Sequence, residues 1–290
     1  MTRCGIVALA GLPNAGKSTL LNALVGEPLS IVSSKPQTTR EPVRGLITDA
    51  ETQVILVDPA GLLDPAYAMQ QAMLQAALAA VSEADLVLHV QPLPDGRAPG
   101  LATLLPAGTR LKAPILTVYT KADLMPPEWR KPPDEASLVV SASSGEGIAQ
   151  LLAAIRARLP EGPFLYDADD VGTQPLRFFA AEFVREAAFA QLEEELPYSL
   201  AVTIDEFQEN ARPILVRGTI GVERDSQKGI VLGAGGRTIK AIGTAARQRL
   251  EAMLGAKVRL ELWVKVWPKW RKDPAVLARL GIPLAPDVRR

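Results

Sequence analysis

One eight-residue stretch near the start of this 290-residue chain constrains its fold more than any other. Residues 11–18, GLPNAGKS, fit the phosphate-binding loop pattern G-x-x-x-x-G-K-[ST] at every fixed position. An apolar run precedes the loop at residues 4–10, and residues 19–25 repeat apolar side chains at helical spacing. Strand, loop and helix in this order are the context that the motif requires. They predict a phosphate site at the end of a buried strand.

The residues of this loop have distinct expected roles. Gly11 and Gly16 let backbone N–H groups turn toward a phosphate, and the helix that follows adds the positive end of its dipole. Lys17 is expected to meet the β- and γ-phosphates of a nucleotide, and Ser18 to ligate Mg²⁺. The alternative is a chance glycine-rich turn, which this context disfavours. The other predicted nucleotide contacts in the loop are Pro13, Asn14, Ala15 and Thr19.

Length and composition exclude several classes of protein. The length fits two domains of ordinary size. Although 48% of the residues are hydrophobic, no apolar run approaches the ~18 residues of a membrane span, and the first residues leave no room for a signal peptide, so we expect a cytoplasmic protein. Cys4 is the only cysteine and His89 the only histidine, and both lie in apolar runs. Disulfides, cysteine-rich metal sites and Ser-His-Asp chemistry are therefore disfavoured.

Three further motifs follow at the ends of predicted strands. Residues 58–61, DPAG, match D-x-x-G after the predicted strand 53–57; we expect Asp58 to hold Mg²⁺ through water and the Gly61 N–H to sense the γ-phosphate. Alone this pattern is usually a turn, but downstream of a phosphate loop it is a strong signal. Residues 120–123, TKAD, follow an apolar run at 115–119, and residues 141–143, SAS, follow one at 137–140.

In this order the motifs resemble the small GTP-binding domains, and Pro36-Gln37-Thr38-Thr39-Arg40 resembles the Era branch of that family. The resemblance implies an α/β fold for residues 1–165: a P-loop GTPase domain with a mostly parallel, doubly wound sheet. It implies that Asp123 accepts hydrogen bonds from two guanine donors, that Lys121 stacks on the base and that the Ala142 N–H meets O6. A carboxylate facing two donors rejects adenine, so GTP and GDP are the implied nucleotides.

The resemblance also implies the remaining site residues. Mg²⁺ would be held by Ser18, Asp58 and a threonine. We assign that role to Thr39, and Thr38 is the alternative. The residues implied to act in hydrolysis are Lys17, Thr39 and Gly61. Further nucleotide contacts are implied at Thr120, Leu124, Ser141 and Ser143.

Three positions qualify this interpretation. Residues 120–123, TKAD, nearly match the family's N-K-x-D motif, whose asparagine supports the phosphate loop. Thr120 replaces that asparagine, so we expect either lower nucleotide affinity or a contact rebuilt through the threonine hydroxyl. Leu62 follows Gly61 where Ras-like enzymes carry a water-orienting glutamine, so intrinsic hydrolysis should be slow. Asn14 lies where related enzymes bind a monovalent cation, which would be K⁺ here; a turn residue is the equally weighted alternative.

The second half of the chain differs in charge. Residues 160–175 combine proline, glycine and acidic residues, so we place a linker at 166–175 and a second domain at 176–290. Within residues 224–272, twelve basic residues face three acidic ones. A charge distribution of this kind suits a polyanionic partner.

The expected elements of the second domain are a helix at 177–195, strands at 201–207 and 214–222, a helix at 234–254 and a strand at 258–266. Residues 229–240, GIVLGAGGRTIK, combine an apolar run, a G-x-x-G loop and a basic helix start. This order resembles the bacterial, type II KH module, an α+β RNA-binding fold. The expected RNA contacts are Lys228, Gly233, Ala234, Gly235, Gly236, Arg237 and Lys240.

The tail after the last strand, residues 267–272, interleaves aromatic and basic residues. RNA contact through Lys269, Trp270, Arg271 and Lys272 is one interpretation, and a solvated basic terminus with tryptophans packed on the domain is the other.

The Era resemblance covers essentially the whole chain. It implies a monomeric GTPase that binds single-stranded RNA near the 3′ end of small-subunit ribosomal RNA and acts in 30S subunit assembly. One rival hypothesis is a GTP-organised RNA chaperone with incidental hydrolysis. Another is a GTPase that acts on a protein or at a membrane surface, with peripheral association only.

Overall fold

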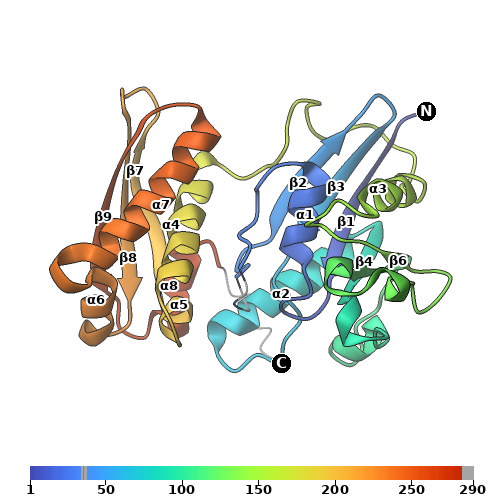
Figure 1. Cartoon of the computed structure of the whole chain (residues 1–290), viewed down its shortest axis with the longest axis horizontal. Coiled ribbons are helices and arrows are strands. Elements are labelled where there is room, and N and C mark those ends of the chain that lie inside the picture. Colours follow the sequence, from blue (N-terminus) through green and yellow to red (C-terminus); the bar gives the residue numbers. More distant parts are fainter. Residues whose placement is uncertain (34, 36–37, 283–290) are drawn as a thin grey trace. The chain divides into compact units, whose positions relative to one another are not determined.

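The structure, a computed structural model, describes residues 1–33, 35 and 38–282. They form two compact units (Figure 1). Unit 1 holds residues 1–66 and 70–173, and unit 2 holds Tyr67–Met69 and the chain from Gln174 onward. The predicted linker therefore belongs to unit 1 as far as Thr173. Pro36 and Gln37 of the stretch 36–40 that resembles the Era branch, and the last eight residues of the predicted second domain, lie outside the described residues.

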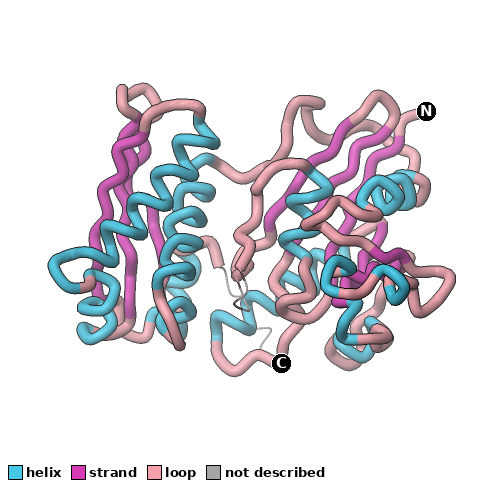
Figure 2. Tube along the Cα trace, in the orientation of Figure 1, coloured by secondary structure: helices cyan, strands magenta, loops and turns pink. Residues whose placement is uncertain are grey.

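Unit 1 is built on a six-stranded sheet in the order β2-β3-β1-β4-β5-β6. Figure 2 shows the strands in magenta. Only β2 runs antiparallel to its neighbour. Both β3 and β4 are buried along their whole length, as continuous apolar strands covered on both faces must be. The strands are β1 (Arg3–Ala10), β2 (Val43–Thr48), β3 (Thr52–Asp58), β4 (Leu86–Pro92), β5 (Ile115–Thr120) and β6 (Leu138–Val139).

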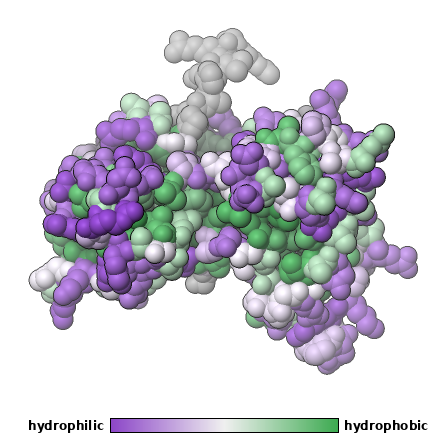
Figure 3. All heavy atoms as spheres, turned by 90° about the horizontal axis from the view of Figure 1, so that it is seen from above, coloured by the Kyte–Doolittle hydropathy of each residue, from purple (hydrophilic) through white to green (hydrophobic). Residues whose placement is uncertain are grey.

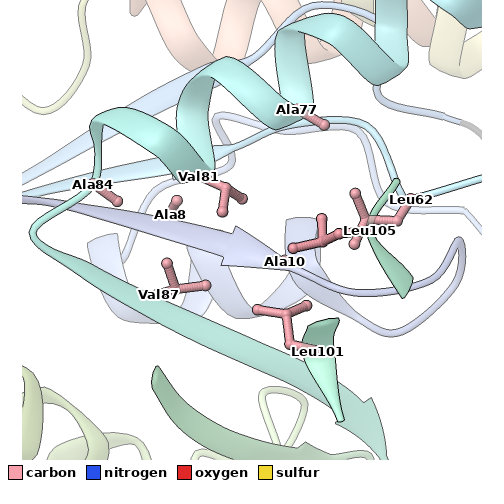
Figure 4. Packing of buried hydrophobic residues seen from close by; sticks show 9 residues of the cluster. All are labelled: Ala8, Ala10, Leu62, Ala77, Val81, Ala84, Val87, Leu101 and Leu105. Atoms are coloured by element: carbon pink, nitrogen blue, oxygen red, sulfur yellow. The ribbon is translucent and has the colours of Figure 1, made fainter. Parts of the chain in front are cut away.

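The helices of unit 1 are α1 (Lys17–Val25), α2 (Ala68–Glu83) and α3 (Ile148–Arg156), with 3-10 turns at Leu93–Asp95, Leu101–Leu104, Ala122–Leu124 and Pro127–Trp129. Both α1 and α3 pack against β3. Small side chains of β1, Ala8 and Ala10, lie under Ala77 and Val81 of α2 (Figure 4). The predicted doubly wound α/β fold is confirmed.

Unit 2 has the predicted helix-strand-strand-helix-helix-strand order. In its sheet, β8 pairs antiparallel with β7 and parallel with β9, which leaves β9 at an edge. Hydrophilic residues gather on the visible face of this unit, with apolar patches between them (Figure 3). The elements are α4 (Leu176–Gln191), α5 (Leu196–Ser199), β7 (Ala201–Gln208), β8 (Ile214–Val222), α6 (Asp225–Leu232), α7 (Arg237–Leu254), β9 (Val258–Val266) and α8 (Pro274–Arg279).

Two predicted helix boundaries were wrong, and one apolar run that had been given no element lies in a helix. The helix expected to reach residue 195 ends at Gln191, because Leu192 is extended and Glu194 has a positive φ. The helix expected from 234 begins at Arg237, because Gly235 and Gly236 are left-handed. The apolar run 229–232 is the last part of α6. Among the described residues, no helix combines the length and the apolar character needed to cross a membrane.

Candidate functional site

The phosphate loop joins β1 to α1 as the motif requires. A Cβ on Gly11 would lie 2.3 Å from the Val90 carbonyl oxygen, so only glycine fits there. Gly16, with φ 93°, makes the left-handed turn into the helix. Lys17 is buried, and its Nζ donates to the carbonyl oxygens of Gly11 and Leu12 at 3.3 and 3.1 Å. Burial lowers the pKa of this ammonium group, an effect that Asp58 opposes.

Three oxygen-bearing side chains converge beside Lys17. The Ser18 hydroxyl donates to Asp58 Oδ2 at 2.6 Å and lies 3.0 Å from the Thr39 hydroxyl. Thr39, which itself lies 3.4 Å from Asp58 Oδ2, is therefore the threonine at this point rather than Thr38. Asp58 is fully buried, which raises the pKa of its carboxyl, and its Oδ1 has no hydrogen-bond partner within the described residues. A carboxylate that has one unpartnered oxygen, and whose other oxygen contacts two hydroxyls, is an oxygen donor set that suits Mg²⁺.

Gly61 and Leu62 face different environments. A Cβ on Gly61 would lie 2.5 Å from the Pro13 nitrogen, so the D-x-x-G turn packs directly on the phosphate loop. The Leu62 N–H donates to the Gly11 carbonyl at 2.9 Å, while its side chain, 2% exposed, lies in the core with Ala10 and Leu105 (Figure 4). Leu62 therefore faces the core and has neither the chemistry nor the position to orient water.

The loop after β5 carries the predicted base contacts. Lys121 is left-handed, with φ 59°. The exposed Asp123 accepts a hydrogen bond from the Ser141 hydroxyl at 2.6 Å, and Ser141 lies 3.0 Å from the Ser143 hydroxyl. The Ser141 hydrogen bond is the main reason that the pKa of Asp123 lies below its ordinary value. The two loops that would recognise the base are thus joined by a hydrogen bond.

Thr120 rebuilds the contact expected of asparagine. Its side chain is 2% exposed, and its hydroxyl donates to the Ala15 carbonyl at 2.6 Å. The hydroxyl also lies 3.4 Å from the Gln91 carbonyl and would lie 3.2 Å from a Cβ on Gly16. The single hydroxyl thus ties the base loop to the phosphate loop.

A pocket of about 350 Å³ brings much of the predicted nucleotide site together. The chain following α1 contributes a wall that was not predicted, because its residues Ile31, Val32 and Ser33 match no motif. Asp123, Leu124 and residues 141–143 stand outside this pocket, and Lys121 alone of the base-loop residues lines it. The predicted residues that line it are Pro13, Asn14, Gly16, Lys17, Ser18, Thr19, Thr38, Thr39, Gly61 and Lys121.

The G-x-x-G loop lies between α6 and α7. Gly233 has φ 70°, and a Cβ there would lie 2.2 Å from the Thr238 hydroxyl oxygen. Gly235 and Gly236 are also left-handed, with φ of 61° and 78°, and open space surrounds them. The loop is therefore narrow and open to a ligand's backbone.

A groove adjoins this loop, between α7 and β9. The side chains of Lys240 and Arg247 line it together with Leu260 and Leu262 of the edge strand, and Gly243 leaves the helix surface bare. Both β9 and α7 were predicted from the sequence, but only their packing reveals that they share a groove. Arg237 and Lys240 are exposed at its loop end.

The position of Trp270 in the tail contradicts the prediction that this residue contacts RNA. Trp270 is 0% exposed, and its Nε1–H donates to the Ser199 carbonyl at 2.8 Å. The Arg271 guanidinium pairs with Glu223 at 2.6 Å. The indole is thus buried against the domain, which is the alternative interpretation, while Lys269 and Lys272 are exposed.

A phosphate loop, an oxygen-lined cation position and a base loop with an accepting carboxylate define unit 1 as a P-loop GTPase domain. Residues 6–121 match a family model described as 50S ribosome-binding GTPase, and residues 195–271 match the KH domain.

Full-length relatives give the family. GTPase Era of Desulfovibrio desulfuricans is 39% identical over 298 residues, covering 97% of each protein. A crystal structure of Aquifex aeolicus Era bound to GDP·AlF4⁻ matches with a TM-score of 0.91 at 36% identity, covering 98% of this chain and 100% of that one. A structure of Era in complex with MgGDPNP and nucleotides 1506–1542 of 16S ribosomal RNA gives the same values. The chain belongs to the Era family of GTPases.

Proposed function

We propose that this GTPase couples GTP binding and hydrolysis to the binding of single-stranded RNA near the 3′ end of small-subunit ribosomal RNA, in cytoplasmic 30S subunit assembly. The observation that carries the proposal is the open G-x-x-G loop with the groove beside it, in the same chain as a complete phosphate site. The relative that was crystallised with 16S ribosomal RNA supports the choice of partner.

For the nucleotide, the proposed contacts follow the geometry of unit 1. Lys17 and the N–H groups of the phosphate loop hold the β- and γ-phosphates, and Asp123 accepts from the guanine ring. Ser18, Thr39 and Asp58 would hold Mg²⁺, which neutralises phosphate charge. Hydrolysis is slow, because nothing at position 62 orients the attacking water; a K⁺ ion held by Asn14 would assist.

For the RNA, the proposed contacts fall on two sides of the groove. The glycine loop lets the sugar-phosphate backbone approach, and Arg237 and Lys240 meet phosphates. Bases lie over Gly243 against the apolar side chains of Leu260 and Leu262. Phosphate contacts position the strand, and base contacts give sequence preference.

The test adds a carboxylate at the loop. Gly236→Asp should lower RNA affinity, because the new side chain meets a left-handed backbone and repels phosphates, while GTP affinity should be unchanged. Arg237→Gln is the comparison; it should weaken binding with little loss of sequence preference. Unaltered RNA affinity of Gly236→Asp at low salt would refute the proposed loop contact.

A second experiment separates the rival functions. Crosslinking in cells, followed by sequencing of the bound RNA, should recover the 3′ region of small-subunit ribosomal RNA. A hydrolysis rate that is insensitive to RNA would favour an RNA chaperone with incidental hydrolysis. Recovery of a protein or membrane partner in place of RNA would favour the third hypothesis. We expect a monomer by gel filtration.

A further inference from the structure

The twelve basic residues in the range 224–272 fall into two groups, those that form an ion pair within the protein and those that do not. Five of them have a carboxylate partner: Arg247, Arg249, Lys257, Arg259 and Arg271. The other seven have no ion pair with any residue that the structure describes: Arg224, Lys228, Arg237, Lys240, Lys265, Lys269 and Lys272. Cations that are not neutralised within the protein are the ones available to an external anion.

Three of these cations, Arg224, Lys269 and Lys272, line one pocket; we call them the tail cluster. The remaining charges in its wall are Glu223 and Arg271, which neutralise each other at 2.6 Å. The pocket therefore carries a net positive charge from three exposed side chains.

The turn that carries Lys269 is anchored at both ends by tryptophans, and Lys272 follows the second of them in a 3-10 helix. The Trp267 N–H donates to the Val222 carbonyl at 2.7 Å, and a Cβ on Gly221 would lie only 2.0 Å from the Trp267 ring. Trp270 is fully buried. Between them Lys269 is held in a left-handed conformation with φ 55°. Because an ordered backbone loses less entropy on binding than a flexible one, this turn is a preorganised support for the exposed lysines.

We infer that the tail cluster is a second phosphate-binding site, which takes a phosphodiester segment of the same RNA strand that the glycine loop holds. The inference rests on the proposed function. Arg224 precedes α6 and Gly233 follows it, so the two sites lie at opposite ends of a helix of about 12 Å. Lys228, on that helix, lies between them along the chain. The structure thus assigns the lysines at 269 and 272, but not the tryptophan between them, to RNA.

The test compares two lengths of RNA with two triple variants. Arg224→Gln/Lys269→Gln/Lys272→Gln removes the cluster, and Arg97→Gln/Arg110→Gln/Lys112→Gln removes the same charge from exposed positions of unit 1. The probes are a labelled tetranucleotide, the length that a KH domain clamps, and a twelve-nucleotide strand. Affinities are measured by fluorescence anisotropy across a salt series.

For the longer strand, the slope of log binding constant against log salt concentration should become shallower by about 2 when the cluster is removed. Each of the three lost phosphate contacts accounts for about 0.7 of this change. Binding of the tetranucleotide should stay unchanged, and the unit 1 variant should behave as the unmodified protein. Equal slopes of both triple variants on the longer strand would overturn the inference. So would weaker binding of the cluster variant to phosphatidylserine vesicles with unaltered RNA binding. If the unmodified protein bound neither RNA, the proposed function itself would fail.

Discussion

The Thr120 hydroxyl donates a hydrogen bond of 2.6 Å to the Ala15 carbonyl oxygen, and this bond ties the loop after β5 to the phosphate loop. Thr120→Val keeps the shape but leaves that buried carbonyl without its donor. The free energy of unfolding should therefore fall by about 1–3 kcal/mol, and GDP affinity should also fall because the phosphate loop is held less firmly. Titration of a fluorescent GDP analogue measures the affinity. Thr120→Ser, which keeps the hydroxyl, should bind nearly normally; equal affinity of the valine and serine variants would contradict the prediction.

Asp123 should determine which base is bound. Asp123→Asn should weaken GTP and improve binding of xanthosine triphosphate, whose 2-oxo group accepts where guanine donates. Competition between the two nucleotides measures the preference. Asp134, half-buried in a loop of the same unit, provides the matched control as Asp134→Asn. An unchanged preference in Asp123→Asn would remove this carboxylate from base recognition.

Leu62→Ala should act on stability more than on chemistry. Because the side chain is buried among core residues, its truncation should lower the free energy of unfolding by about 2–5 kcal/mol. Hydrolysis per folded molecule should change only modestly. Urea denaturation and single-turnover hydrolysis separate the two effects. Leu78→Ala, at a half-buried position on α2, should lose less; a loss in Leu62→Ala below that of this control would count against core packing.

His89 should make the protein sensitive to mild acid. It is 2% exposed, its Nε2 lacks a partner within the described residues, and burial lowers its pKa. Below about pH 6.5 the unfolded chain therefore binds a proton that the folded chain does not, so stability falls as pH falls, by up to about 1.4 kcal/mol per pH unit until the lowered pKa is reached. Urea midpoints between pH 7.5 and 5 check this. His89→Leu should lose this contribution, and an identical pH profile would rule it out.

Asn14 should determine the response to monovalent cations if it holds K⁺. Hydrolysis in K⁺ should then exceed that in Na⁺, and Asn14→Ala should erase the difference. Asn14 is left-handed, with φ 62°, so alanine also adds backbone strain. Asn14→Gly removes the side chain without that strain and is the decisive variant. Equal hydrolysis rates in K⁺ and Na⁺ for the unmodified protein would refute the cation hypothesis. Asn14 would then be a turn residue that favours the conformation of the phosphate loop.

The parts of the site that were predicted from sequence are those that local spacing determines. The phosphate loop and the D-x-x-G motif each lie at the end of one strand. Glycines at fixed intervals in the sequence indicate the backbone conformation that phosphate binding requires. Strand β9 was predictable because its side chains alternate with period two. In all these cases the information lies within a few consecutive residues.

What could not be predicted depends on distant packing. The convergence of the Thr39 hydroxyl with Asp58 depends on the end of strand β3, 19 residues further along the chain. Burial of Trp270 depends on a carbonyl 71 residues away. The helix at 274–279 was missed, although Asp273 caps it, because six residues are too few for a periodic pattern. Each outcome requires tertiary contacts that no local motif encodes.

The segment at 164–172 crosses the edge of the unit 1 sheet. Gln53 binds it through the backbone of Leu165 and Tyr166, and the Leu46 N–H of edge strand β2 donates to the Val171 carbonyl. A β-strand with unpaired edge groups is a template for pairing with other chains. Cutting the chain after residue 165 would therefore uncover β2 and leave Gln53 with fewer partners. An isolated GTPase domain that keeps Thr173 should stay soluble where the shorter fragment aggregates.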